Sequence, residues 1–162
     1  MSSYNDTDER RFYLDTMVPY ALLRAADPAA LSLFRRIEQG EVVAYTSTLT
    51  FDELAYRLIL ALIRDAFDGS PLDRLRQDET GMLSRFAPVV SQQLHRLAAL
   101  PNLHLVPVLP DDVDRMMDSL TRYHLRPRDG LHLAAMERVG CFALISQDAH
   151  FDRVPQLRRY TL

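Results

Sequence analysis

The sequence has no lysine or tryptophan and little cysteine or glycine. All 19 basic side chains of its 162 residues are arginine. A lysine nucleophile or Schiff base is therefore excluded, and any phosphate contact must use a guanidinium group. The single cysteine, Cys141, excludes an internal disulfide framework and a cysteine-built zinc site. Five glycines exclude a collagen-like chain.

Long apolar runs are also missing. The longest extends from Leu58 to Ile63 and is far too short to cross a bilayer. The polar, acidic residues 1–11 do not have the apolar segment of a secretory signal. A net charge of −3 does not fit a broad duplex-DNA binder, whose surface is strongly basic. We expect a soluble, cytoplasmic protein without a membrane partner.

Length and composition favour one globular domain, with 48% hydrophobic and 25% charged residues. We expect a flexible N-terminal extension over residues 1–10 and a single domain over 11–162. Apolar patterns predict strands at 11–14, 42–46, 103–108, 141–145 and 160–162. Helices are expected over 18–24, 28–40, 50–67, 87–100, 110–123 and 127–140, and 68–80 is expected to be a loop with one short helix. This alternation predicts an α/β sandwich with a mainly parallel sheet of four or five strands.

Two of the expected helices carry informative apolar stripes. In the helix 110–123, we expect Val113, Met116, Met117 and Leu120 to face inward. The helix 50–67 has one stripe that includes Phe51 and Leu58. It has a second stripe, formed by Leu49, Tyr56, Leu60 and Ile63. A helix with two apolar sides is covered twice, either by its own chain or by a second subunit, and we expect a homodimer.

Carboxylates stand where strands end. Asp15 and Asp148 follow two expected strands, and Glu53 opens the helix after strand 42–46. Groups beyond the carboxyl ends of parallel strands share one crevice, so these three should converge. Each also has a local explanation. Asp15 and Asp148 can cap helices, and Glu53 can form a capping box with Thr50 or pair with Arg57.

Other catalytic patterns are missing. The sequence has no glycine-rich phosphate loop, nucleophile elbow or HExxH motif. The histidines show no zinc spacing and are interpreted as surface or packing residues; they are His95, His104, His124, His132 and His150.

Four segments together resemble the acidic motifs of the PIN-domain ribonucleases, most closely the VapC-type toxins of toxin–antitoxin pairs. The segments are FYLDTMVPY, TLTFDELAYRL, RPRDGLHLAAM and LISQDAHF, in the family's order. They contain, respectively, Asp15, Glu53, Asp129 and Asp148. Gly130 departs from the alanine usual in the family, and the middle of the chain is longer than in compact toxins.

The resemblance implies a three-layer α/β/α PIN-like sandwich and hydrolysis of RNA phosphodiester bonds. It assigns the catalytic role to the four acids and adds Asp152 as an extra acid seen in some members. Clustered carboxylates raise one another's pKa, and a divalent cation relieves this conflict. Ligands that are all oxygen favour Mg²⁺ or Mn²⁺.

We expect Asp15, Asp129 and Asp148 to hold the metal, with Glu53 orienting or deprotonating the attacking water. The Thr16 and Ser146 hydroxyls would hold the aspartates in place. Arginines are expected to bind the substrate phosphate. Arg126 and Arg128 are the first candidates, and Arg24 is the second.

The resemblance also implies a small antitoxin partner that inserts a segment into the acidic groove. Two alternatives stay open at this point. One is a PIN-fold nuclease that processes RNA, and the other is a non-catalytic PIN-fold module that binds RNA or protein and uses its acids as caps.

Overall fold

The centre of the molecule is a parallel sheet of six strands, seen in a computed structural model that describes residues 2–162. The strand order is β1-β6-β5-β2-β3-β4. The strands are β1 (Ser2–Ser3), β2 (Arg11–Leu14), β3 (Val43–Ser47), β4 (Leu103–Val106), β5 (Ala143–Ile145) and β6 (Arg158–Thr161). The predicted α/β fold is confirmed, and every strand pair is parallel.

The sixth strand comes from the segment that we expected to be a flexible extension. Ser2–Ser3 pair with β6, and Tyr4–Asp6 form a 3₁₀ turn, η1. Tyr4 is buried, donates its hydroxyl proton to the Ala29 carbonyl at 3.2 Å, and packs edge-on against Phe12. Burial of this aromatic ring gives residues 2–6 a regular structure that their polar composition hid.

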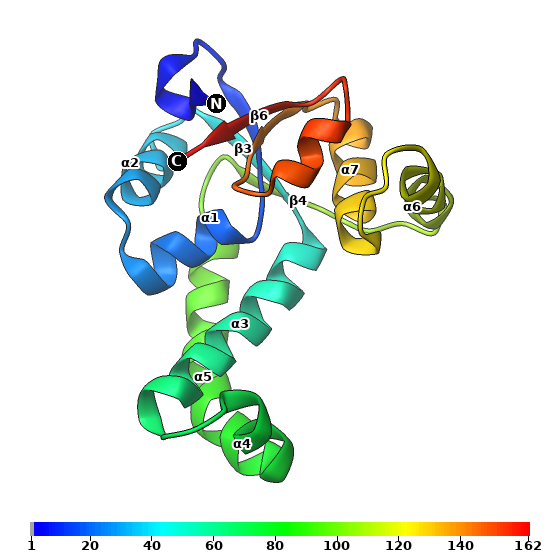
Figure 1. Ribbon diagram of the computed structural model, residues 1–162. Coiled ribbons are helices and arrows are strands. Elements are labelled where there is room, and N and C mark those ends of the chain that lie inside the picture. The colour runs from blue at the N-terminus through cyan, green and yellow to red at the C-terminus, as the bar shows by residue number, and fades with distance from the viewer. Residues whose placement is uncertain (1) are drawn as a thin grey trace.

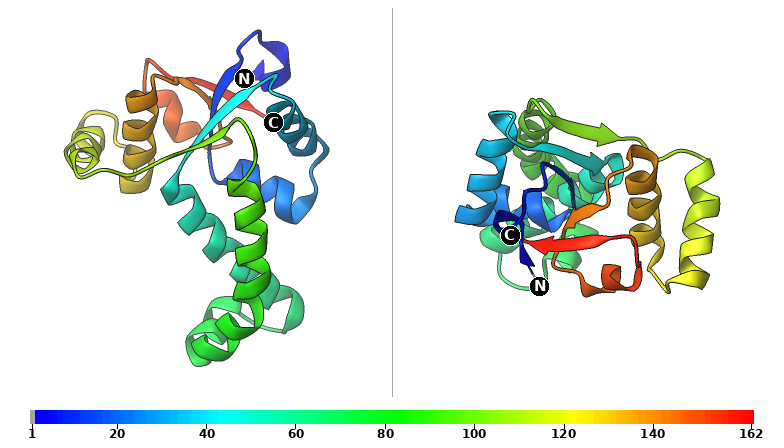
Figure 2. Two further views of the ribbon diagram at one scale, coloured as in Figure 1. Left: turned by 180° about the vertical axis from the view of Figure 1, so that it is seen from behind. Right: turned by 90° about the horizontal axis from the view of Figure 1, so that it is seen from above.

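Helices cover both faces of the sheet (Figures 1 and 2). Alternate residues of β2 separate the two cores, because Phe12 and Leu14 point to one face and Tyr13 to the other. The first face is covered by α1 (Met17–Tyr20), the π-helical turn η2 (Ala21–Ala25), α2 (Pro28–Glu38), α3 (Thr48–Ala66) and α5 (Glu79–Ala98). The second is covered by α7 (Pro127–Val139) and the 3₁₀ turn η3 (Ala149–Arg153). This is the predicted three-layer arrangement.

A helical arm projects from the sheet, formed by α3, α5 and the short α4 (Pro71–Gln77) (Figure 1). Here the chain itself covers much of the second stripe of α3. Ile63 is fully buried in a cluster with residues of α4 and α5, and Leu60 packs against the same cluster. Tyr56 stays 48% exposed. Across residues 2–162, no helix is both long and apolar enough to cross a bilayer.

Helix α5 begins eight residues before its predicted start. Its first residue is Glu79, and the Asp78 carboxylate accepts a hydrogen bond from the Gly81 N–H at 3.0 Å as an N-cap. The charged residues of this segment hid a helix whose apolar side packs within the arm. Met82 and Phe86 provide that side.

Helix α6 (Asp111–Arg122) lies outside α7 rather than against the sheet (Figure 2). Val113 and Met117, expected to face inward, are each 47% exposed. The residues of α6 that are buried are Asp112 and Ser119. Because α6 packs mainly on a single helix, only a narrow side of it is covered, and this expectation was wrong for two of its four residues.

Gly130 lets α6 and α7 approach closely. A Cβ at this position would lie 3.1 Å from Met116 Cγ, 3.2 Å from its Cα and 3.3 Å from its carbonyl oxygen. These distances are too short for an unstrained methyl group, and two of the three atoms belong to backbone. The close helix contact therefore explains the departure from alanine noted in the sequence.

We expect Gly130→Ala to lower the free energy of unfolding by roughly 1 kcal/mol. Overpacking typically costs about 1–3 kcal/mol, whereas alanine gains about 1 kcal/mol over glycine inside a helix. Chemical denaturation of both proteins measures the difference. A more stable variant would mean that α6 moves away at little cost.

Candidate active site

Four predicted acids line one pocket at the carboxyl ends of the strands. The pocket has a volume of about 540 Å³. Asp15 follows β2, Glu53 projects from α3 after β3, Asp148 follows β5, and Asp129 lies near the start of α7. The remaining lining residues are Thr16, Met17, Arg57, Arg126, Pro127 and Arg128. The convergence inferred from strand order is therefore present, and Asp129 joins it from a helix.

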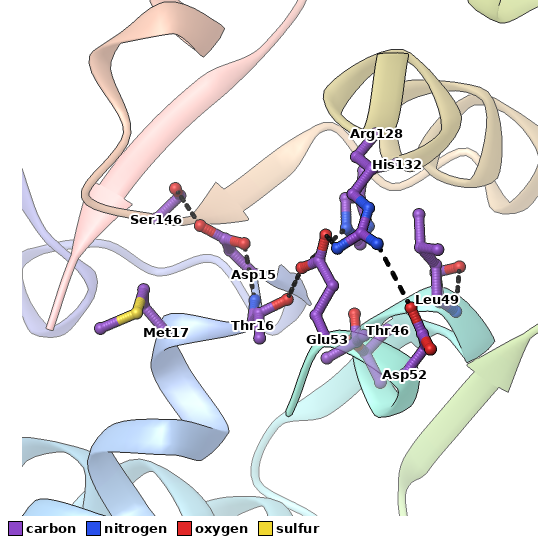
Figure 3. A network of polar contacts seen from close by, with 12 residues as sticks. Asp15, Thr16, Met17, Thr46, Leu49, Asp52, Glu53, Arg128, His132 and Ser146 are labelled. Atoms are coloured by element: carbon purple, nitrogen blue, oxygen red, sulfur yellow. Dashed lines mark hydrogen bonds and ion pairs between the residues drawn. The ribbon is translucent and has the colours of Figure 1, made fainter. Parts of the chain in front are cut away.

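Asp15 is held at both carboxylate oxygens (Figure 3). The Thr16 backbone N–H donates to Oδ1 at 2.6 Å, and the Ser146 hydroxyl donates to Oδ2 at 2.6 Å. The backbone N–H of Asp15 bonds the Ile145 carbonyl at 3.2 Å, which anchors this residue to the end of β5. Ser146 also accepts a hydrogen bond from the Asp148 N–H at 3.0 Å, so one hydroxyl links two predicted ligands.

Glu53 stands in the second turn of α3, one turn later than predicted, because the helix begins at Thr48. Ser47 caps this helix, and the Thr50 hydroxyl bonds that of Thr46 at 2.8 Å. Neither the suggested capping box nor a pair with Arg57 is formed in the described chain. The carboxylate instead points into the pocket.

Three side chains surround the Glu53 carboxylate (Figure 3). The Thr16 hydroxyl donates to Oε2, Arg128 Nη1 donates to Oε1 at 3.1 Å, and His132 Nε2 faces Oε2 at 3.9 Å. Burial acts to raise the pKa of Glu53, but its contacts with His132, Thr16 and Arg128 outweigh burial and lower this pKa to about 2. Thr16 thus holds Asp15 by its backbone, and its hydroxyl holds Glu53 rather than an aspartate.

Asp148 caps η3. Its Oδ1 accepts hydrogen bonds from the His150 backbone N–H at 2.9 Å and from His150 Nδ1 at 2.6 Å. Desolvation acts to raise the pKa of Asp148, yet these two hydrogen bonds, with the nearby charges of His150 and Arg126, lower it overall. Asp148 therefore caps η3, as its local explanation suggested, and it also lines the pocket.

Asp129 is the least satisfied of the four acids. Its Oδ2 is buried and has no hydrogen-bond partner among residues 2–162. Desolvation raises the pKa of Asp129, and the negative charges of Asp148 and Asp15 raise it further. The charges of His132 and Arg126 act in the opposite direction, but they do not offset burial and the two neighbouring carboxylates.

The predicted arginines differ in position. Arg128 is paired with Glu53 and with Asp52 at 3.5 Å, whereas the Arg126 side chain forms no hydrogen bond or ion pair with another residue of 2–162. Arg24 pairs with Asp65, which lies twelve residues beyond Glu53 on α3. This is about 18 Å along the helix axis, so Arg24 is not brought to the pocket.

Asp152, the possible extra acid, also lies outside the pocket lining. Arg159 holds it with two hydrogen bonds of 2.7 Å. The side-chain hydrogen bond to Arg159 lowers the pKa of Asp152. A bidentate pair of this kind satisfies the carboxylate within the chain.

The donor set of the pocket fits a hard divalent cation. Its carboxylates supply oxygen atoms alone, and Asp129 Oδ2 is a buried oxygen without a donor. In residues 2–162, however, no three His, Cys, Asp or Glu side chains stand in the geometry of a formed metal shell. The hydrogen bonds to Asp15 and Asp148 hold these groups in positions that a cation would have to adjust.

Sequence reasoning missed His132 and Tyr13. His132 was interpreted as a packing or surface residue, and it is buried, but it faces Glu53 and bonds the Tyr13 hydroxyl at 2.9 Å. One signal was available, because residues three apart on a helix share a face and His132 follows Asp129 by three. Nothing in the strand pattern distinguished Tyr13 from its apolar neighbours.

A parallel sheet with a crevice of acids at its carboxyl ends defines an α/β protein with its candidate site at the usual ligand-binding edge. Residues 12–157 match the family model of the PIN domain. The chain therefore belongs to the PIN-domain family, and the resemblance noted in the sequence is confirmed.

Solved structures share this fold at low sequence identity. The chain is similar to VapBC2 from Rickettsia felis, crystallised with a DNA fragment from its promoter, with a TM-score of 0.62, 12% identity, and 93% of this chain and 98% of that chain covered. It is similar to VapC20 of Mycobacterium tuberculosis, described as a sarcin-ricin loop cleaving toxin, with a TM-score of 0.56, 17% identity and coverage of 87% and 92%. It is also similar to a toxin–antitoxin complex from Klebsiella pneumoniae, with a TM-score of 0.56, 16% identity, and 90% of this chain and 94% of that chain covered. No curated protein sequence matches the chain.

We expect Asp129→Asn to be more stable than the wild type at neutral pH in the presence of EDTA. The folded-state pKa of Asp129 is raised, so the folded wild type loses stability as pH rises from the ordinary aspartate value through this raised value. The advantage of the variant should therefore disappear below about pH 4, where the carboxyl is protonated in both states.

Urea denaturation across this pH range measures the difference. Asp118→Asn, which removes an exposed carboxylate on α6 outside the pocket, is the matched control and should not gain stability at neutral pH. A variant no more stable than the wild type at neutral pH would contradict the unfavourable environment assigned to Asp129.

Proposed function

We propose that this protein is a metal-dependent ribonuclease that hydrolyses RNA phosphodiester bonds, and that it is the toxin of a toxin–antitoxin pair. The observation that carries the proposal is the convergence of Asp15, Glu53, Asp129 and Asp148 on one pocket that also has arginines at its rim. Membership of the PIN-domain family and structural similarity to VapC toxins support it.

Asp15, Asp129 and Asp148 are the proposed ligands of Mg²⁺ or Mn²⁺, directly or through water. A bound divalent cation lowers the pKa of its water and neutralises charge that develops on the phosphate. Asp129 gains most from such a partner, because its buried Oδ2 has no donor and its charge is opposed by two neighbouring acids. Ser146 keeps Asp15 and the Asp148 backbone together.

Glu53 is proposed to orient the attacking water rather than to remove its proton. A carboxylate with a pKa of about 2 is a weak base at neutral pH, but it remains a good hydrogen-bond acceptor. Water attacks the phosphorus and releases one proton to solvent, while the bond from phosphorus to the leaving sugar oxygen breaks and that oxygen takes up a proton from solvent. Arg126 lines the pocket and has no hydrogen-bond or ion-pair partner in the described chain, and we propose that it binds a phosphate oxygen of the RNA.

Two protein partners belong to the proposal. An antitoxin that covers the acidic groove is supported by relatives solved as toxin–antitoxin complexes. A homodimer is supported less strongly, because α4 and α5 already cover part of the second stripe of α3. The exposed ring of Tyr56 is the part of this stripe still open to a second copy. We place the protein in the cytoplasm, in keeping with its cysteine content.

One observation favours a second function, a non-catalytic PIN module that binds RNA or a protein. The carboxylates of Asp15, Glu53 and Asp148 are already held by hydrogen bonds within the chain. In such a module, these carboxylates stabilise the fold and take no part in catalysis. An RNA-processing nuclease is chemically the same as the first proposal and differs from it in the RNA chosen.

We expect the protein to cleave a mixed-sequence single-stranded RNA with Mg²⁺ or Mn²⁺ and to stop when EDTA is added. Asp15→Asn should reduce the cleavage rate by on the order of 100-fold or more, because it removes a charge from the centre of the pocket. Gel analysis of labelled RNA measures both effects. Equal cleavage by the variant, or cleavage in EDTA, would contradict the assignment.

Asp118→Asn serves again as the matched control, since it removes an exposed carboxylate on α6. A second readout separates the metal from the substrate. Mn²⁺ should raise the free energy of unfolding of the wild type but not of Asp129→Asn. No cleavage together with no stabilisation by Mn²⁺ would favour the non-catalytic module.

We expect Arg126→Ala to weaken RNA binding without changing stabilisation by Mn²⁺. Loss of one phosphate contact to a single strand should reduce the slope of log affinity against log salt by roughly 0.7. Fluorescence anisotropy in EDTA measures binding without cleavage. Arg10→Ala removes an exposed arginine just before β2, at the other end of that strand, and should have no effect. An equal loss of RNA affinity in both variants would indicate that RNA responds only to the net positive charge and not to Arg126 in particular.

A further inference from the structure

Behind the carboxylate pocket lies a buried histidine with one unpartnered nitrogen. His132 is 3% exposed, and its Nε2 forms no hydrogen bond with any residue of 2–162. This nitrogen lies 3.9 Å from Glu53 Oε2. Figure 3 shows the imidazole beside the Glu53 carboxylate, on the side opposite Thr16. His132 therefore faces a predicted catalytic acid without lining the open pocket.

The other ring nitrogen is held from the sheet. The Tyr13 hydroxyl lies 2.9 Å from His132 Nδ1. The two rings meet edge to face, with centroids 5.8 Å apart. Tyr13 is fully buried in the core between β2 and α7, so bulk water cannot replace this hydrogen bond. Tyr13, His132 and Glu53 thus form a chain from the core to the pocket.

A neutral imidazole has two tautomers, and they act differently on Glu53. If Tyr13 donates its proton to Nδ1, the ring carries its hydrogen on Nε2 and presents a donor to the carboxylate. If Tyr13 accepts from Nδ1–H, the bare lone pair of Nε2 faces the negative Oε2, which is repulsive. The hydrogen bond at one ring nitrogen sets the state of the other.

We propose that Tyr13 is a positioning residue that fixes His132 as the Nε2–H tautomer, so that His132 donates toward Glu53 and holds its carboxylate in the pocket. The Thr16 hydroxyl bonds the same Oε2 and Arg128 bonds Oε1. His132 is the one of these three that is held from the core. The effect of this tautomer on catalysis rests on the proposed function, whereas the assignment of the tautomer does not.

The tautomer is measured by long-range ¹H–¹⁵N NMR of the histidine side chains. In the wild type, we expect His132 to show the pattern of hydrogen on Nε2, with His132→Gln identifying its signals among the five histidines. Glu53 itself favours hydrogen on Nε2, so the role of Tyr13 is tested in Glu53→Gln, which removes this charge. With Tyr13 present, Glu53→Gln should keep the Nε2–H tautomer, whereas Glu53→Gln combined with Tyr13→Phe should show a mixture of tautomers. A wild-type signal of the Nδ1–H or doubly protonated form would overturn the proposal, as would the same tautomer in Glu53→Gln with and without the Tyr13 hydroxyl.

Tyr45→Phe is the matched control. Tyr45 lies on β3 directly beside Tyr13 in the register of the sheet, and its hydroxyl accepts a hydrogen bond from Arg11 rather than bonding His132. This variant removes the hydroxyl of a half-buried tyrosine on the neighbouring strand and should leave the His132 signals unchanged. The wild-type measurement decides the tautomer even if Tyr13→Phe does not fold.

The effect of Tyr13 on catalysis is tested with a double-mutant cycle of Tyr13 and His132. If the protein cleaves RNA, Tyr13→Phe should lower kcat by roughly tenfold with little change in KM, since Tyr13 does not line the pocket. In a His132→Gln background, the same change should have no further effect. Additive losses would overturn the coupling. Absence of RNA cleavage would refute the proposed function and leave the tautomer result intact.

Discussion

Repulsion among four carboxylates is the constraint on which the structure around the pocket depends. Parallel strands deliver Asp15 and Asp148 to the same edge, and helices add Glu53 and Asp129. Ionised groups so close together are stable only if donors or cations compensate them. Three of the four receive donors from the chain, and Thr16 donates to two of them, Asp15 and Glu53. Asp129 does not, and its pKa is raised as a result. Hydrogen-bond donors of the chain thus compensate the charges of Asp15, Glu53 and Asp148, but no such donor reaches the buried Oδ2 of Asp129.

The sheet makes this compensation possible because its residues alternate between two cores. In β2, Phe12 and Leu14 pack on the side of α2 and α3, while Tyr13 points to α7. The same strand therefore supplies apolar packing on one face, a polar hydroxyl on the other, and Asp15 at its end. Gly130 has a related role on the far side, because it admits the backbone of Met116 beside the first turn of α7. Packing of the outermost helix is in this way connected to the turn that carries Asp129.

Local signals in the sequence, namely strand-end position and helix period, were sufficient for the parallel sheet and for the convergence of Asp15, Glu53 and Asp148. Asp129 and the three-layer arrangement were expected only from the family resemblance. The sequence was insufficient where tertiary contacts decide. Tyr4 looked like part of a polar tail until the core that receives it was visible. Val113 looked inward because periodicity identifies an apolar stripe but not what covers it. Arg24 was expected at the substrate and is paired on the arm, since no local pattern fixes the end point of a long side chain. His132 and its link to Tyr13 depend on a contact between residues 119 positions apart.

The cations that face the pocket are Arg57, Arg126 and Arg128. A guanidinium keeps its proton at any pH at which a protein stays folded, so the positive charge of the rim is constant. Changes of pH alter the electrostatic potential of this pocket without changing the charge of these three arginines. Acetylation, which removes positive charge from lysine, has no lysine side chain to act on in this sequence. Reagents and enzymes that acylate lysine therefore cannot neutralise the arginine side of this pocket.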